Sequence, residues 1–330
     1  MPPLSQFPRS SVATLPTPIH PLPRLSAQMA GPALWVKRDD LTGLAFGGNK
    51  VRKLEFLLGE AQTQGADTLI TTGAPQSNHA RQTAAVASKG GLQCALVLRC
   101  EPPTESTGNI LLDRLLGADI VWAGRRPASD VMDDVAAELR ARGRKPFVIP
   151  LGGSNSTGAL GYVAAMHEFT EQCTSIGVTF DALVFATSSG GTQAGLVVGA
   201  WMTGFAGRVV GISVDHRADE FRQTLAPLAN ATARRLDLPA TFAASDFDVR
   251  DDYLGGGYAV LGEPEREAIA LAAQTEGLLV DPVYTGRALA GLIDLIRKVE
   301  FGPGQNVLFW HTGGTPALFA YNRQLTSHAP

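Results

Sequence analysis

A lysine follows two glycines and an asparagine in the stretch GGNKVRKL, which begins at residue 47, and a helical pattern starts at the same point. A helix dipole disfavours positive charge at the helix N-terminus, and burial of an ammonium group lowers its pKa. A lysine with a lowered pKa is both a nucleophile and a base near neutral pH. We therefore expect Lys50 to form a Schiff base with a carbonyl compound, and we expect Lys53 to face away from it.

A glycine-rich loop predicts a site for an anion. The stretch ATSSGGTQAG, residues 186–195, follows an apolar run and opens a helical pattern. Glycines let backbone N–H groups approach an anion, hydroxyls add donors, and the helix dipole favours negative charge. The loop is neither a Walker A motif nor a GxGxxG fingerprint, and a turn without a ligand is the alternative. We therefore expect this loop to hold a phosphate.

Two more polar loops follow apolar runs. The run Gln76-Ser77-Asn78-His79 precedes a helical pattern and holds more polar side chains than a helix cap requires, although capping alone is the alternative. The run HTGGTP begins at residue 311 and ends before another helix. In parallel sheets, ligands bind at the carboxyl ends of the strands, so we expect these loops to meet at one site.

A lysine suited to Schiff-base formation, a phosphate loop and no nucleotide motif together indicate pyridoxal 5'-phosphate as the cofactor. Two alternatives remain. A protein that only carries this cofactor would need Lys50 and the phosphate loop, but it would not need the polar run at residues 76–79. A Rossmann-type enzyme acting on a nucleotide or a phosphorylated sugar is the other.

Short apolar runs alternate with amphipathic stretches along the chain. We expect strands at residues 33–36, 68–71, 94–98, 119–122, 146–149, 182–186, 209–214 and 306–310. We expect helices at residues 51–64, 78–89, 107–117, 128–142, 191–204, 263–277 and 286–299. Strands that are apolar on both faces and separated by helices indicate parallel sheets covered on both sides. Residues 152–155 are either a link between two α/β units or a strand-to-helix turn.

Composition excludes several classes of function. The chain has 330 residues, 45% of them hydrophobic, and a formal net charge of −3, which gives no basic field for a nucleic acid or an anionic membrane. The proline-rich start lacks the apolar core of a signal peptide, so a cytoplasmic location is expected. Cys94, Cys100 and Cys173 are widely spaced, and the histidines are not clustered. We therefore expect neither disulfides nor a metal site.

Five segments, in this order, resemble one family: KRDDLTGLAFGGNKVRKLEF, TTGAPQSNHARQTA, ATSSGGTQAG, DPVYTGRA and HTGGTPALFAY. They are similar to the pyridoxal-phosphate enzymes that include aminocyclopropane-carboxylate (ACC) deaminase, D-cysteine desulfhydrase and L-cysteate sulfo-lyase, over about residues 7–321. The resemblance implies the α/β tryptophan-synthase-β-like fold, fold type II, with two parallel-sheet domains. A large cofactor-binding domain would comprise residues 1–50 and 161–330, and a small domain residues 51–160. A homodimer is also implied.

The resemblance further implies roles for individual residues. Lys50 would carry the cofactor and act as a base near the substrate Cα, and Asn78 would bond the phenolic oxygen of the cofactor. Thr315 would contact the pyridine nitrogen. The residues implied as phosphate ligands are Ser188, Ser189, Gly190, Gly191 and Thr192. Ser77, helped by His79, would bind the substrate carboxylate. The implied catalytic residues are Lys50, Ser77 and Tyr284, and the residues implied on the substrate side are Ser77, Asn78, His79, Tyr258, Tyr284, Thr285 and Thr312. The two tyrosines could instead be core residues.

One departure from the family pattern favours a particular reaction. In the pattern typical of ACC deaminases, Tyr-Glu-Gly stands at the positions of residues 284–286, and Leu-Gly-Gly at the positions of residues 312–314. This chain has Tyr-Thr-Gly and Thr-Gly-Gly there. A carboxylate near the ring nitrogen would keep the nitrogen protonated, and the neutral Thr285 does not. Losing a good leaving group from Cβ needs a weaker electron sink than opening a strained ring. The sequence therefore favours β-elimination over ACC deamination.

The choice of substrate stays open between D-cysteine, which would yield pyruvate, hydrogen sulfide and ammonia, and L-cysteate, which would release sulfite. We favour D-cysteine. L-Cysteate brings a second anion, for which Arg81, His79 or the threonines would have to supply donors. Arg81 is equally well interpreted as a surface ion-pair residue.

Overall fold

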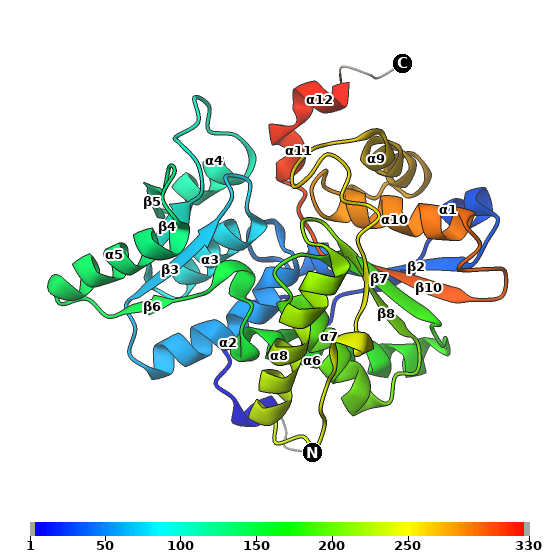
Figure 1. Ribbon diagram of the computed structural model, residues 1–330, viewed down its shortest axis with the longest axis horizontal. Helices are drawn as coiled ribbons and strands as arrows, with labels where there is room; N and C mark the ends of the chain where they lie inside the picture. Colours follow the sequence, from blue (N-terminus) through cyan, green and yellow to red (C-terminus); the bar gives the residue numbers. More distant parts are fainter. Residues whose placement is uncertain (1–3, 327–330) are drawn as a thin grey trace.

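The apolar runs of the sequence form strands that are buried on both faces. In the computed structural model, which describes residues 4–326, every residue of β3 (Thr68–Gly73) and of β7 (Ala182–Thr187) is buried. Continuous burial of this kind requires helices on both sides of a sheet. The described chain contains two such sheets, and helices surround each of them (Figure 1).

The larger sheet has six strands in the order β1-β2-β10-β7-β8-β9. β1 pairs with β2 antiparallel, and the other neighbours are parallel. The strands are β1 (Ile19–Pro21), β2 (Ala33–Arg38), β7, β8 (Arg208–Ser213), β9 (Asp248–Arg250) and β10 (Asn306–His311). One face packs against α1 (Pro23–Met29), α9 (Glu263–Glu276) and α10 (Thr285–Arg297), and the other against α6 (Ser156–Ile176) and α7 (Gly191–Thr203), beyond which lies α8 (Ala218–Arg235).

The smaller sheet has four parallel strands in the order β5-β4-β3-β6. The remaining strands are β4 (Gln93–Leu98), β5 (Asp119–Trp122) and β6 (Pro146–Val148). α2 (Asn49–Thr63) and α3 (Asn78–Lys89) cover one face and α5 (Ala128–Ala141) the other, while α4 (Gly108–Leu115) packs on α3. Two short helices, α11 (Ala317–Ala320) and α12 (Asn322–Thr326), end the described chain.

The expected small domain, residues 51–160, contains all four strands of the smaller sheet. Its expected ends fall inside α2 and α6, and these two helices pack extensively against each other. The boundary between the domains therefore stays a prediction, because α2 contributes to the core of the small sheet and also contacts a helix of the large one.

A buried ion-pair network joins the two parts beside the large sheet. Asp39, which follows β2, accepts two hydrogen bonds from Arg52 of α2, at 2.9 and 2.8 Å, and Arg52 also bonds Glu168 of α6. Lys37 donates to Glu168 at 2.5 Å, so it belongs to the same network. Burial alone would raise the pKa of Asp39, but Arg52 lowers it to about 2, so the carboxylate stays charged.

Several elements differ from the sequence-based expectation. The long α6 and α8 and the three-residue strands β1 and β9 were not expected. Residues 152–155 prove to be a strand-to-helix turn, since Asn155 caps α6 by accepting from the Gly158 N–H at 2.8 Å. The three cysteines are unpaired. Residues 4–326 contain no cluster of potential metal ligands and no helix long and apolar enough to cross a membrane.

Candidate active site

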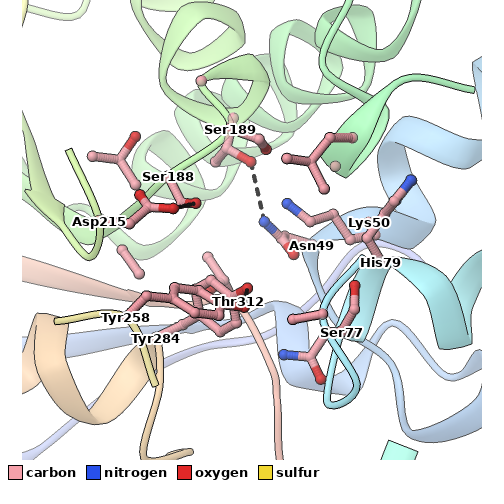
Figure 2. A pocket seen from close by; sticks show the side chains of 18 of the residues that line it. Asn49, Lys50, Ser77, His79, Ser188, Ser189, Asp215, Tyr258, Tyr284 and Thr312 are labelled. Atoms are coloured by element: carbon pink, nitrogen blue, oxygen red, sulfur yellow. Dashed lines mark hydrogen bonds between the residues drawn. The ribbon is translucent and has the colours of Figure 1, made fainter. Parts of the chain in front are cut away.

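The predicted site residues meet in one cavity between the two sheets (Figure 2). The cavity holds about 720 Å³ of empty space, its open mouth included, which is within the range of small-molecule sites. Eleven of the sequence-predicted residues line it: Lys50, Ser77, Asn78, His79, Ser188, Ser189, Gly190, Thr192, Tyr258, Tyr284 and Thr312.

Close contacts leave no room for a side chain on the two glycines before Lys50. A Cβ on Gly47 would lie 2.2 Å from the Asp40 carbonyl oxygen. Gly48 has a φ of 126°, and a Cβ on it would lie 2.4 Å from the Gln82 amide. A Cβ on Gly313 would lie 2.6 Å from the Gly48 Cα. The Asn49 N–H donates to the Thr312 carbonyl at 2.9 Å, so the first turn of α2 is fixed against the loop after β10. This contact places Lys50 at the cavity wall rather than on the outer surface.

The amine of Lys50 is suited to covalent chemistry. Burial lowers the pKa of Lys50 to about 8, and the carboxylate of Asp215 opposes that effect. Within the described residues the amine makes no hydrogen bond or ion pair. A substantial fraction of this amine is therefore neutral near physiological pH, as a nucleophile must be.

A chain of hydrogen bonds prepares the phosphate loop for an anion. Lys53 Nζ donates to Ser154 Oγ at 2.9 Å, and Ser154 Oγ donates to Ser189 Oγ at 2.8 Å. Because the Ser189 oxygen accepts this bond, its own proton is free to donate toward the cavity. A Cβ on Gly152 would lie 2.1 Å from the Ser189 hydroxyl, so only glycine fits behind it.

The expectation that Lys53 faces away from Lys50 is wrong. Residues three apart on a helix lie on neighbouring positions of its surface. Lys53 is fully buried, and burial, followed by the charge of Lys50, holds the pKa of Lys53 well below its usual value. A bound phosphate would offset both effects and favour the ammonium form.

The other loop residues contribute in different ways. The Ser188 hydroxyl donates to Asp215 at 2.9 Å, so its proton is already engaged. Gly191 does not line the cavity, because its N–H donates to Ser154 Oγ at 3.1 Å behind the loop. The Thr192 hydroxyl accepts from the Asn49 amide at 3.1 Å, which joins the first turn of α2 to that of α7. The N–H groups of Ser189 and Gly190 have no partner within residues 4–326 and are free to bind an anion.

The N-terminus of α3 forms a second anion site. Ser77 caps the helix by accepting from the Ala80 N–H at 3.1 Å. The N–H groups of Asn78 and His79 remain without partners in the described chain, as expected for the first turn of a helix. These groups meet a carboxylate at the cavity wall.

The side chain of His79 does not fit the donor role implied by the resemblance. The Thr71 hydroxyl donates to the Ile149 carbonyl at 2.9 Å, so His79 Nε2, 2.8 Å from the same hydroxyl, must be the donor to it. Burial and the charges of Lys50 and Lys53 hold the pKa of His79 well below its usual value. The ring is neutral, its Nδ1 is an acceptor, and only the backbone N–H of His79 is a donor for a carboxylate.

Two tyrosines form the opposite wall of the cavity (Figure 2). The hydroxyls of Tyr258 and Tyr284 lie 2.5 Å apart and share a hydrogen bond. Burial, and then the neighbouring Tyr258, hold the pKa of Tyr284 well above its usual value, so Tyr284 stays protonated. One proton of the pair occupies the shared bond, and the other is available to a ligand.

Besides Gly191, two predicted residues lie outside the cavity wall. Thr285 is fully buried, and its hydroxyl donates to Asp281 at 2.7 Å in the first turn of α10. Thr315 is half-buried in the loop before α11, where its carbonyl accepts from the Leu318 N–H at 3.0 Å. Neither side chain is among those that line the cavity.

The sequence-based prediction missed four polar residues of the cavity wall: Asn49, Arg99, Thr187 and Asp215. Arg99 directly follows β4 and Asp215 lies two residues beyond β8, so their place after apolar runs was the signal that would have found them. Arg99 is exposed, and its guanidinium has no partner within residues 4–326. Of the two interpretations left open for Arg81, the surface ion-pair role is wrong, because this residue is fully buried.

The geometry defines a class of protein. A lysine of lowered pKa and a loop of unpartnered N–H groups and hydroxyls lie in one cavity, and the Thr187 hydroxyl beside the loop is buried without a partner. An aldehyde cofactor with a phosphate would use all of these groups, so the residues fit pyridoxal phosphate. The arrangement is that of a pyridoxal-phosphate enzyme.

Comparison with known proteins agrees with this class. The family described as pyridoxal-phosphate-dependent enzymes matches residues 11–313. A D-cysteine desulfhydrase of Klebsiella pneumoniae (strain 342) is 45% identical over 98% of each chain, and one of Salmonella choleraesuis (strain SC-B67) is 44% identical over 97% of this chain and 98% of its own.

Solved structures show the same relationship. An ACC deaminase homologue superimposes with a TM-score of 0.91 at 40% identity, over 98% of this chain and 97% of that one. A threonine deaminase of Solanum lycopersicum shares the fold, with a TM-score of 0.69 at 15% identity over 98% and 84% of the two chains. The chain belongs to the ACC deaminase/D-cysteine desulfhydrase family of pyridoxal-phosphate-dependent enzymes. The expected fold type II architecture and the expected cofactor are thereby confirmed.

Proposed function

We propose that the protein catalyses β-elimination on a small β-substituted amino acid and converts D-cysteine to pyruvate, hydrogen sulfide and ammonia. The observation that carries this proposal is the 45% identity to a D-cysteine desulfhydrase over 98% of both chains. The first turn of α10 supports it. The Thr285 hydroxyl is committed to Asp281, so position 285 brings no carboxylate to the cofactor ring.

Pyridoxal phosphate, when bound, supplies the electron sink that makes the substrate Cα–H acidic and permits loss of the Cβ substituent. Lys50 would hold the cofactor covalently, and its amine would accept the proton from the substrate Cα when it is not attached to the cofactor. We assign the phosphate to the Ser189 hydroxyl and to the backbone N–H groups of residues 188–190.

The substrate is held at the start of α3 in this proposal. The N–H groups of Asn78 and His79, together with the Ser77 hydroxyl, bind its carboxylate at the positive end of the helix dipole. This contact fixes Cα near Lys50, which lines the same cavity. The Tyr258–Tyr284 pair faces the substrate side and supplies a proton to the departing sulfur, because Tyr284 remains protonated at any physiological pH.

L-Cysteate is the alternative substrate, and Arg99 is the observation that favours it. Its unpartnered guanidinium at the cavity wall would suit a second anion such as the sulfonate. ACC deamination is less well supported, because this chain has Thr285 at the position where the pattern of ACC deaminases has a glutamate. A protein that binds the cofactor without catalysis would leave the free N–H groups of α3 without a purpose.

One set of assays tests the proposal. The purified protein, loaded with cofactor, is given D-cysteine, L-cysteine, L-cysteate and ACC separately, and pyruvate, sulfide and sulfite are measured. The highest kcat/KM should belong to D-cysteine, with sulfide and pyruvate in equal amounts. A preference for L-cysteate with release of sulfite would select the alternative, and no turnover of any substrate would favour the carrier.

The variant Lys50→Ala is the internal control for these assays. It should lose turnover and the covalent attachment of the cofactor while its circular dichroism spectrum stays unchanged. The expected homodimer and cytoplasmic location remain predictions, and light scattering of the purified protein measures the first of them.

A further inference from the structure

The amide of Asn78 is held from behind by two residues that do not line the cavity. Its Oδ1 accepts from Asn109 Nδ2 at 3.0 Å and from Arg81 Nη1 at 3.3 Å. Arg81 and Asn109 are both fully buried. The nitrogen of the Asn78 amide has no partner within residues 4–326, and this side chain lines the cavity.

The orientation of these amides follows from the inventory of donors and acceptors. Arg81 has only donors, and it contacts one end of the Asn109 amide at 2.9 Å, so that end must be the oxygen. The other end is therefore the nitrogen, and it donates to the Gln76 carbonyl at 2.8 Å. The atom of Asn78 that faces this nitrogen must be an acceptor. Asn78 can thus present only its N–H₂ group to a ligand.

The two holding residues are themselves fixed by the backbone. Arg81 Nη2 donates to the Gly47 carbonyl at 2.8 Å, in the loop that leads to Lys50. The Asn109 N–H donates to Gln76 Oε1 at 2.8 Å, and a Cβ on Gly108 would lie 2.4 Å from the same oxygen. The start of α4 is therefore locked onto the loop before α3, and one buried cation links Asn78 to the loop that carries Lys50.

We propose that Arg81 and Asn109 are positioning residues that make Asn78 a fixed hydrogen-bond donor to the phenolic oxygen of pyridoxal phosphate. This inference rests on the role at the phenolic oxygen that the family resemblance implies for the Asn78 side chain. A donor at the phenolic oxygen stabilises its anionic form, so the proton that this oxygen shares with the Lys50 nitrogen is released at lower pH. The network of α3 and α4 would therefore set the pH at which the bound cofactor loses that proton.

The variant Asn109→Asp removes the nearer of the two donors to Asn78. A carboxylate still pairs with Arg81, but it repels the Asn78 oxygen, which then has only the 3.3 Å bond from Arg81, so the Asn78 nitrogen is no longer a fixed donor to the cofactor. The visible absorption of the holoenzyme is titrated against pH without substrate. The pH midpoint of this absorbance titration should rise by roughly one unit, because the free energy of a hydrogen bond to a charged group corresponds to a pKa change of about that size.

Three further variants complete the test. Asn78→Ala should raise the pH midpoint by a similar amount. Asn109→Ala adds no charge and should also raise it, so this variant replaces Asn109→Asp if the latter does not fold. Arg114→Ala, at an exposed position of the same helix, should leave the midpoint unchanged. Melting temperatures are measured in parallel, because a purely structural role would lower them without moving the midpoint.

The outcomes are distinct. Wild-type midpoints in the folded Asn109 variants would overturn the inference, whatever their stability. A wild-type midpoint in Asn78→Ala would overturn it too, by removing Asn78 from the phenolic oxygen. Failure to turn over D-cysteine bears only on the proposed reaction, because the titration contains no substrate.

Discussion

At the scale of single residues, the site depends on amines whose charge is made unfavourable by burial. Burial lowers the pKa of Lys50 to about 8 and holds that of Lys53 well below its usual value. The two lysines have different surroundings. Lys50 faces the cavity without a partner, whereas Lys53 donates to Ser154 and to the Gly152 carbonyl at 2.5 Å. The first is suited to covalent attachment and the second to balancing a phosphate.

The pH dependence of cofactor attachment follows from Lys50. Only the neutral amine attacks an aldehyde, and the neutral fraction grows as pH rises toward the pKa. The rate at which apo-protein takes up pyridoxal phosphate should therefore rise through a midpoint near pH 8, the pKa of Lys50, and level off above it. Stopped-flow absorbance measures this rate, and a midpoint near the ordinary value for lysine would contradict the prediction.

Asp215 provides a matched variant for that experiment. Its carboxylate raises the pKa of Lys50 against the effect of burial. Asp215→Asn removes the charge with little change in shape, so the midpoint of uptake should move to lower pH. A midpoint that stays in place or moves upward would show that Asp215 does not act on the amine.

Lys53→Met should weaken cofactor binding without weakening the fold. Methionine keeps most of the buried volume but removes the cation behind Ser154 and Ser189. Losing one charge-assisted bond costs about 1.5–3 kcal/mol, so the Kd for the cofactor should rise roughly 10- to 100-fold. Apo-protein stability should not fall, because a buried ammonium is removed.

Equilibrium dialysis and urea unfolding of the apo-protein measure the two quantities separately. Lys89→Met, at an exposed position at the end of α3, is the control and should change neither. Equal losses of affinity and stability in Lys53→Met would instead indicate a packing role.

At the scale of elements, the first turn of α10 shows why the Thr285 side chain does not line the cavity, although the sequence-based interpretation placed it on the substrate side. The carboxylate of Asp281 accepts from the N–H groups of Val283, Tyr284 and Thr285 at 2.9, 3.0 and 2.8 Å. The Thr285 hydroxyl donates to this carboxylate and accepts from the Asp281 N–H, each at 2.7 Å. A glutamate at position 285 would bring a second buried carboxylate against Asp281, so it would perturb more than the cofactor ring.

Thr285→Val should destabilise the protein. Valine has nearly the shape of threonine but leaves the Asp281 N–H without its partner, which costs about 1–3 kcal/mol for a buried donor. Urea unfolding of the apo-protein measures the loss. Thr285→Ser keeps the hydroxyl and should lose less than the valine variant; the reverse order would mean that the methyl group matters more than the hydrogen bonds.

Elements whose ends or exposed face are marked in the sequence were predictable, and elements without such a signal were not. α3 spans Asn78–Lys89 as expected, because a capping serine precedes it and glycines follow it. In α6, residues 157–163 are all buried, so no alternation of polar and apolar positions marks a surface helix. β1 and β9 have three residues each, too few to show a period. Tertiary packing, rather than local pattern, determines these elements.

The same distinction holds within the site. Lys50 and the phosphate loop belong to motifs of several residues, and the structure brings them together in one cavity. Arg99 and Asp215 are single residues after strands, so their position after an apolar run is the only signal that marks them, and no motif separates them from solvated charges. The network of Arg81 and Asn109 depends on contacts between α3 and α4, which only the folded chain provides.

At the scale of the whole molecule, the cavity is built from the carboxyl ends of both sheets. The smaller sheet contributes the start of α3 and Arg99 after β4, and the larger sheet contributes the phosphate loop after β7 and Asp215 after β8 (Figure 1). Burial raises the pKa of Tyr258, while the charge of Arg99 opposes this, so the two side chains influence each other across the cavity. A substrate bound between them contacts both halves of the molecule.

Arg99→Ala therefore tests which part of the substrate spans the cavity. If the guanidinium binds a group on Cβ, losing it should lower kcat/KM for the doubly anionic L-cysteate by about tenfold or more, the value of one bond between charged groups. D-Cysteine, whose carboxylate is assigned to α3, should lose little. Arg125 is another exposed arginine and follows β5 of the smaller sheet. The control variant Arg125→Ala should leave kcat/KM for both substrates unchanged. Equal losses for the two substrates would place Arg99 at their common carboxylate, and no loss for either would leave it a solvated residue at the mouth.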